Sequence, residues 1–184
     1  MVILDKYKNL STKSPKEAAD IVGEVEKRNY LAHTIRDIEL AILRTQSRHY
    51  HIITCTAANS QKSKILFFDN CCEIWLTCDY EEINERDIRL ILAHELGHLV
   101  FNIDKLKNPE ILQKTAGSDE EEIKAWVFAY HLIYKKSVEH QNDTQKKKFI
   151  YRNGELKQSL ESYLKKHKPE ISDAVIKSLS TSAP

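Results

Sequence analysis

The stretch LAHELGHLV at residues 92–100 holds three ionisable side chains among residues that are otherwise apolar or glycine. His94 and His98 are four positions apart, so on an α-helix they project from one face and can reach a single ion. Glu95 lies about 100° around the axis from His94, where it can act on a water beside that ion. Neutral imidazole suits Zn²⁺, whose charge lowers the pKa of a bound water toward about 7. The stretch therefore predicts a zinc hydrolase site.

The surrounding helix supports this interpretation. Its sequence, DIRLILAHELGHLVFN, is apolar nearly all round, which predicts a buried position in the domain centre. Two histidines and a carboxylate in such a helix need compensation, which a divalent cation supplies. Gly97 costs about 1 kcal/mol in mid-helix, which indicates close approach by another element or a ligand. The alternative is that His94 and His98 are core histidines paired with the backbone.

A catalytic zinc site typically takes three protein ligands, so a third one is needed. In the pattern HExxHxxGxxH a glycine turn brings it back, but here Phe101 stands at the glycine position and Asp104 at the last histidine position. Without that glycine we expect the chain to continue as a helix, which carries Asp104 to the wrong side and leaves it a second choice. Two histidines and a carboxylate also suit Mn²⁺, Fe²⁺ or Co²⁺.

Three consecutive glutamates of the next helix compete for the third position. Glu120 begins a face that looks exposed. Glu121 forms a capping box with Ser118, in which the hydroxyl accepts a free backbone N–H and the carboxylate reaches back, so it already has a structural task. Glu122 begins an apolar stripe with Trp126, where its carboxylate points toward the core. Helical geometry favours Glu122 over the other two.

The flanking sequence predicts the elements that position these residues. Two helices are expected at residues 14–30 and 33–44, the first with Ser14 as its N-cap. Three β-prone runs follow, HYHIITCTA, KILFF and EIWLTC, and the Asp69-Asn70 pair between the last two predicts a hairpin.

The expected fold class is α+β. Residues 1–140 are predicted to form one domain, mostly helical, with a small β-sheet of about three strands beside the HExxH helix. Asn84 is expected to cap that helix. Residues 141–184 are predicted to form a basic helical extension packed on the same domain, with a break at Asn153-Gly154.

Two motifs resemble those of a known family. RLILAHELGH at 89–98 and EIKAWVFA at 122–129 are similar to the R-x-x-x-A-H-E-L-G-H helix and the E-x-x-A-x-x-F-A motif of the ImmA/IrrE family of bacterial and phage zinc metallopeptidases. The resemblance covers about residues 15–135. It implies that residues 1–140 form a zincin-like metallopeptidase domain with a gluzincin-type site. In this site Glu95 is the general base, and the three zinc ligands are His94, His98 and Glu122. Family members are associated with cleaving or otherwise inactivating DNA-bound repressors, so such a substrate is implied.

One position departs from the family pattern. Members commonly have Asn where this chain has Trp126. An amide oxygen there could accept the N–H of a zinc-bound histidine, whereas an indole only donates, so that acceptor must come from elsewhere.

The sequence leaves open which residue steadies the oxyanion. For each candidate the alternative is a role in packing or at the surface. The candidates are Tyr130, His131, His51, His49 and Tyr50. The strand at 49–55 could also pair with an extended peptide substrate.

The sequence thus predicts a zinc-dependent metalloendopeptidase that hydrolyses peptide bonds of a regulatory protein such as a DNA-binding transcriptional repressor. The rival hypothesis is a regulatory protein-binding module with a structural zinc site, motivated by Trp126 and the basic tail. In both cases the expected partner is a protein, and direct binding to a membrane or to nucleic acid is not expected.

Composition fits one ordinary soluble domain, with 184 residues of which 41% are hydrophobic and 30% charged. The N-terminus lacks the apolar centre of a secretory signal, and no run approaches the roughly 18 apolar residues that cross a bilayer, so a cytoplasmic location is expected. Residues 135–184 carry 11 Lys/Arg against 6 Asp/Glu, which we interpret as a solvated helix face. The cysteines are interpreted as small apolar residues of strands; they are Cys55, Cys71, Cys72 and Cys78.

Overall fold

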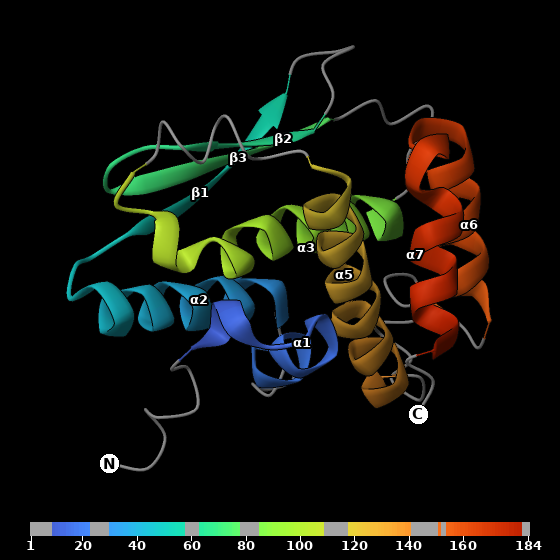
Figure 1. Cartoon of the computed structure of the whole chain (residues 1–184), viewed down its shortest axis with the longest axis horizontal. Helices are drawn as coiled ribbons and strands as arrows, with labels where there is room; N and C mark the ends of the chain where they lie inside the picture. The colour runs from blue at the N-terminus through green and yellow to red at the C-terminus, as the bar shows by residue number, and fades with distance from the viewer. Residues whose placement is uncertain are drawn as a thin grey trace.

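The chain folds as a mostly helical α+β structure, which confirms the predicted class. The computed structural model describes residues 9–22, 30–57, 63–77, 85–108, 118–140, 151 and 154–181. Within these ranges the elements are α1 (Pro15–Val22), α2 (Tyr30–Gln46), β1 (His51–Ala57), β2 (Lys64–Phe67), β3 (Cys71–Thr77), α3 (Glu85–Phe101), α5 (Asp119–His140), α6 (Glu155–His167) and α7 (Pro169–Thr181), with short 3-10 turns at Leu10–Thr12 and Ile103–Lys105. The sheet covers one side of α3, α1 and α2 lie on the other side, and α5 crosses α3 (Figure 1).

The small sheet is mixed. Its strand order is β1-β3-β2, with β1 parallel and β2 antiparallel to β3. The hairpin predicted at Asp69-Asn70 is confirmed, because β2 and β3 pair on either side of it with Phe67 opposite Cys72. This register buries Phe67, Cys72 and Ile74, as the two-residue period of a half-buried strand requires. The described cysteines are free thiols, namely Cys55, Cys71 and Cys72.

The central helix α3 ends at Phe101, which corrects the expectation that it continues as a helix. Asn102 leaves helical geometry with φ −114° and ψ 11°, and its side-chain Nδ2 donates to the carbonyl of His98 at 2.9 Å. An amide that satisfies a carbonyl of the last turn ends a helix without a glycine. The 3-10 turn that follows leaves Asp104 exposed, where its carboxylate accepts a hydrogen bond from the hydroxyl of Ser11. Asp104 therefore lies outside the group of candidate ligands.

A hydrogen bond and an ion pair hold the first turn of α5. The hydroxyl of Ser118 accepts from the N–H of Glu121 at 3.3 Å, which is the first half of the predicted capping box. The carboxylate of Glu121 pairs instead with Lys105, whose Nζ lies 3.3 Å away.

The start of α1 has a complete capping box. The N–H of Ser14 donates to the carboxylate of Glu17 at 3.0 Å, and the N–H of Glu17 donates to the Ser14 hydroxyl at 3.3 Å. The cap predicted at Ser14 is thus confirmed, whereas the box predicted at Ser118 is present only in its first half.

Gly97 lies at a close approach of α3 and α5. A Cβ at this position would lie 3.0 Å from Ala125 Cα, 3.1 Å from Ala125 O and 3.1 Å from a ring carbon of Phe128. Two of these three atoms belong to the backbone of α5, so a methyl group would require the helix to move. The close approach predicted from the glycine is confirmed, and the element that approaches is α5.

Substituting Gly97 with alanine is expected to lower the free energy of unfolding by up to about 2 kcal/mol. Overpacking against α5 costs about 1–3 kcal/mol, and the helix propensity of alanine offsets about 1 kcal/mol of that. Urea unfolding followed by circular dichroism measures the difference. An alanine variant at least as stable as the wild type would show that α3 and α5 do not approach this closely.

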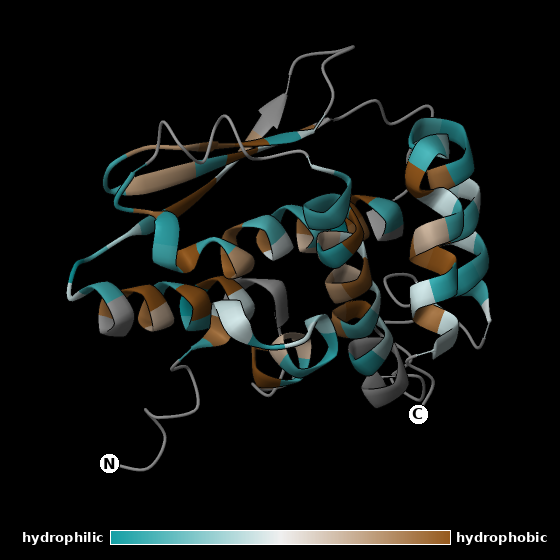
Figure 2. Ribbon diagram, in the orientation of Figure 1, coloured by the Kyte–Doolittle hydropathy of each residue, from teal (hydrophilic) through white to brown (hydrophobic). Residues whose placement is uncertain are grey.

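The two C-terminal helices pack on the same core as the other elements. α6 begins after Gly154, whose φ of 80° lies in the left-handed region that glycine adopts without strain, as expected for the predicted break. Each helix contributes an apolar stripe spaced by four residues, and the polar side of α6 faces outward (Figure 2). The buried residues of these stripes are Leu156, Leu160, Leu164, Ile171, Val175 and Leu179.

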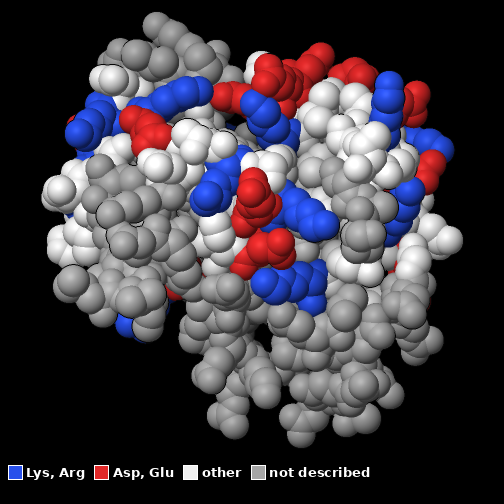
Figure 3. Space-filling model, turned by 60° about the horizontal axis from the view of Figure 1, so that its bottom comes forward, with Lys and Arg blue, Asp and Glu red and all other residues white. Residues whose placement is uncertain are grey.

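Acidic and basic side chains are interspersed on the surface that Figure 3 shows. None of the helices in the described ranges has the length and apolar content needed to cross a membrane. Three features named from the sequence lie outside the described residues, namely Cys78, the cap at Asn84 and residues 141–150 of the predicted basic extension.

Candidate metal centre

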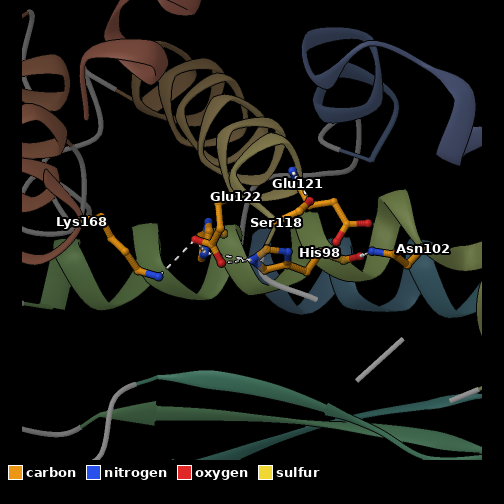
Figure 4. Close-up of polar contacts among 7 residues, drawn as sticks. His98, Asn102, Ser118, Glu121, Glu122 and Lys168 are labelled. Carbon is orange, nitrogen blue, oxygen red and sulfur yellow. Dashed lines mark hydrogen bonds and ion pairs between the residues drawn. The ribbon is translucent and has the colours of Figure 1, made fainter. Parts of the chain in front are cut away.

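The side chains of His94 and His98 from α3 meet that of Glu122 from α5 (Figure 4). The two Nε2 atoms of the histidines are 3.1 Å apart. Glu122 places Oε1 3.3 Å from Nε2 of His98 and Oε2 3.5 Å from Nε2 of His94. Two imidazole nitrogens and a carboxylate therefore converge on one point in the core.

These separations fit a zinc ion. Ligand atoms bound to Zn²⁺ at about 2.0–2.2 Å with tetrahedral angles are about 3.3–3.5 Å from one another. In this group the two Nε2 atoms are 3.1 Å apart, and they lie 3.3 and 3.5 Å from two different oxygens of Glu122. One ligand atom from each of the three residues lies within 4.8 Å of the others. A metal ion between the three side chains would also compensate the burial of their polar atoms. The residues present thus fit a divalent metal ion.

The protonation states of these side chains suit metal binding. Burial, together with the charge of His98, holds the pKa of His94 well below its usual range, so the ring is neutral and can donate a lone pair. Although burial favours the neutral acid, the hydrogen bond with His98 and the neighbouring positive charges, Lys168 among them, lower the pKa of Glu122 to about 2. At neutral pH the group therefore offers a neutral imidazole and an ionised carboxylate without first losing a proton from either.

Glu95 lies beside this group in the interior of the protein, with 5% of its surface exposed. Burial is the main cause that raises its pKa to about 7, and the negative charge of Glu122 acts in the same direction. A carboxyl group with a pKa near the working pH can both accept and return a proton. Glu95 therefore has the environment of a general base.

This raised pKa makes a pH-dependent contribution to stability. A carboxyl group whose pKa rises on folding binds its proton more tightly in the folded protein, so the free energy of unfolding falls as pH rises from about 4.5 to about 7. In metal-free protein we expect Glu95→Gln to match the wild type near pH 4.5 and to be more stable at pH 8 by roughly 2–3 kcal/mol.

Urea unfolding in the presence of a chelator, at several pH values, measures this difference. The lowered pKa of His94 affects both proteins alike, so it cancels when the two curves are subtracted. Parallel stability curves for the two proteins would contradict a raised pKa at Glu95.

Trp126 forms one wall of the site. Its ring stacks on that of His94 with centroids 3.9 Å apart and planes inclined by 18°. The indole Nε1 and the Nδ1 atoms of His94 and His98 are buried and have no hydrogen-bond partner among the described residues. The indole thus fixes the plane of the His94 ring, but the described residues supply no hydrogen-bond acceptor for Nδ1 of His94 or Nδ1 of His98.

The other two glutamates of α5 point elsewhere. Glu120 is 78% exposed and pairs with Lys124 one turn later at 2.6 Å. Glu121 pairs with Lys105 at the surface. Of the three candidates, the structure places only Glu122 against the histidines.

Three of the residues expected to steady the oxyanion have other surroundings in the structure, namely Tyr130, His131 and His51. Tyr130 packs against the rings of His131 and Tyr134, with centroids 5.5 and 5.8 Å away. Burial and the charge of Lys16 in α1 lower the pKa of His131, so this ring faces α1. His51 begins the edge strand β1 and is exposed. No contact described for Tyr130, His131 or His51 joins them to the ligand group.

The edge of β1 is already used at one position. The N–H of Ile52 donates to the carboxylate of Glu39 in α2 at 2.9 Å. An extended peptide that paired along the whole edge would have to displace this side chain.

Two residues near the site were not predicted from the sequence, and both come from the C-terminal helices. Nζ of Lys168 lies 3.4 Å from Oε2 of Glu122. The ring of Tyr163 lies 5.3 Å from that of Trp126, and burial together with the charge of Glu95 raises the pKa of Tyr163 to about 12. No motif or spacing marks either residue, since each approaches the site only through the packing of α6 and α7.

Comparison with known proteins finds no family model, no curated protein and no solved structure that matches this chain. The candidate metal centre therefore rests on the contacts of its own side chains.

Proposed function

We propose that this chain is a zinc-dependent metalloendopeptidase with a zincin-like, gluzincin-type site. His94, His98 and Glu122 hold the ion, and Glu95 is the general base. The observation that carries the proposal is the convergence of the three ligand side chains at 3.1–3.5 Å in the core, next to a second buried carboxyl group. The resemblance of the two motifs to the ImmA/IrrE family supports the same assignment.

The chain's own residues divide the work of hydrolysis. A bound zinc ion would polarise the scissile carbonyl and activate a water. Glu95 takes the proton of that water on its carboxylate and passes it to the leaving amine, a transfer that contributes typically 10²–10⁴-fold to the rate. Trp126 holds the ring of His94 in one plane by stacking at 3.9 Å, which keeps Nε2 directed at the ligand group.

The proposed substrate is a regulatory protein, such as a repressor bound to DNA, and the proposed compartment is the cytoplasm. The family resemblance supports the substrate class. A repressor encoded beside the gene is the first substrate to test, because neighbouring genes often supply the partner of such an enzyme.

The test is a cleavage assay with purified components. Zinc-loaded protein is incubated with the repressor, and intact masses are recorded over time. We expect two fragments whose masses add up to the repressor plus one water, loss of cleavage with a chelator, and recovery with added zinc. Zinc-loaded protein that cleaves neither this repressor nor an unfolded protein such as casein would contradict the proposal.

A second function is favoured by one observation. The outer nitrogens of both histidines lack acceptors among the described residues. Such acceptors typically contribute 10–100-fold to metal affinity or activity. A regulatory protein-binding module with a structural zinc site fits this arrangement, and it would bind the repressor in the same assay without producing fragments.

A further inference from the structure

Lys168 connects α6 to α7 and reaches the ligand group from outside the α3–α5 pair (Figure 4). Its Nζ lies 3.4 Å from Oε2 of Glu122, the same oxygen that lies 3.5 Å from Nε2 of His94. The side chain of Lys168 is 35% exposed and that of Glu122 is 14% exposed. The ammonium group therefore stands between the ligand group and solvent.

The base of this side chain is held in place by the core. The N–H of Lys168 donates to the carbonyl of Leu164 at 2.7 Å, and the N–H of Ile171 donates to the carbonyl of Lys168 at 3.3 Å. Leu164 and Ile171 are both buried. Rotations within the side chain can move the ammonium group, but these two hydrogen bonds hold the backbone of Lys168 beside the site.

This position has two electrostatic consequences. An ion held by Glu122 competes with Lys168 for one carboxylate and carries charge of the same sign, so the ammonium disfavours the cation. When the carboxylate of Glu122 binds the ion, the ammonium group of Lys168 loses its ion-pair partner. It then attracts any anionic oxygen that reaches the site. One side chain thus acts in opposite directions on a cation and on an anion.

We propose that Lys168 is a residue of the metal site, a cation that makes the loaded site select anionic oxygen, either a substrate carboxylate or the oxyanion that develops during hydrolysis. The inference rests on the proposed function, since it presupposes that His94, His98 and Glu122 hold a metal. It assigns a specificity role to the C-terminal extension, whose packing brings Lys168 to the ligands.

The test compares Lys168→Met with a matched control, Lys105→Met, in the full chain. Lys105 makes the same kind of ion pair with Glu121, at 3.3 Å, one residue before the ligand. Zinc affinity is measured by competition with a chromogenic chelator. Co²⁺, which the same donor set accepts, gives a visible spectrum that is titrated with acetate as the anionic probe and imidazole as the neutral one.

We expect Lys168→Met to bind zinc about three- to tenfold more tightly and acetate about three- to tenfold more weakly, with imidazole binding unchanged. Lys105→Met should match the wild type in all three titrations. Lys168→Arg, which keeps the positive charge, should stay close to the wild type and provides a second variant if the methionine variant folds poorly.

The opposite changes in zinc affinity and acetate affinity distinguish this role from a structural one. A variant that only loosened the site would lose affinity for cation and anion alike. If Lys168→Met behaves as Lys105→Met does, or loses affinity for zinc, the inference is overturned while the metal site stands. If the wild type binds neither Zn²⁺ nor Co²⁺, the proposed function fails, and the inference fails with it.

Discussion

The Glu122→Gln variant is expected to bind zinc at least about 100-fold more weakly than the wild type. The amide keeps the size of the side chain but removes the negative charge that faces both histidines at 3.3 and 3.5 Å. Loss of a residue that only orients a ligand typically costs 10–100-fold, and loss of a ligand itself costs more. Zinc content after dialysis and a competition titration with a chelator measure the change.

Glu121→Gln is the matched control for this experiment. Glu121 is the preceding residue of the same helix, but its carboxylate pairs with Lys105 at the surface. Loss of an ion pair of this kind costs at most about 1 kcal/mol of stability, and zinc affinity should not change. Equal zinc affinities for Glu122→Gln and the wild type would remove Glu122 from the ligand set, and a loss confined to Glu121→Gln would reverse the assignment.

The Glu95→Gln variant is expected to cleave substrate about 10²–10⁴-fold more slowly while it keeps its zinc. Glutamine cannot take a proton from water, but Glu95 is not one of the three residues whose ligand atoms converge. The rate of fragment formation and the zinc content of the same preparation are the two measurements.

The combination of the two readings decides between the proposed functions. A slow variant with full zinc supports the role of Glu95 in proton transfer. If the variant keeps its zinc and its fold and still performs the cellular function, the peptidase proposal is wrong and the binding module with a structural zinc site takes its place. Loss of zinc together with activity would place Glu95 among the residues that hold the metal.

The features that could be predicted from the sequence are those fixed by local geometry. The four-residue spacing of His94 and His98 places them on one face of any helix, and an Asp-Asn pair between two β-prone runs gives a hairpin. The preference for Glu122 over its neighbours also follows from helical angles, because the three side chains point about 100° apart.

The features that could not be predicted depend on particular side-chain contacts, two of which join distant segments. α3 ends where the side chain of Asn102 donates to the carbonyl of His98, and neither a glycine nor a proline marks this position in the sequence. Lys105 takes the carboxylate of Glu121 away from the cap it was expected to complete. Lys168 reaches Glu122 only because the leucine stripe of α6 is buried in the core. For Glu121 and Glu122 the partner lies on another segment of the chain, whereas Asn102 bonds to a carbonyl four residues before it.

The ligands come from two different helices, and His98 and Glu122 are 24 positions apart in the chain. An ion that joins them therefore closes a loop, as a disulfide does, and closing a loop of this length removes about 3–4 kcal/mol of conformational entropy from states in which α5 has left α3. Unlike a disulfide, this cross-link opens when the ion leaves. The supply of free zinc would then set how often the two helices separate, and with it how quickly cellular proteases degrade the chain.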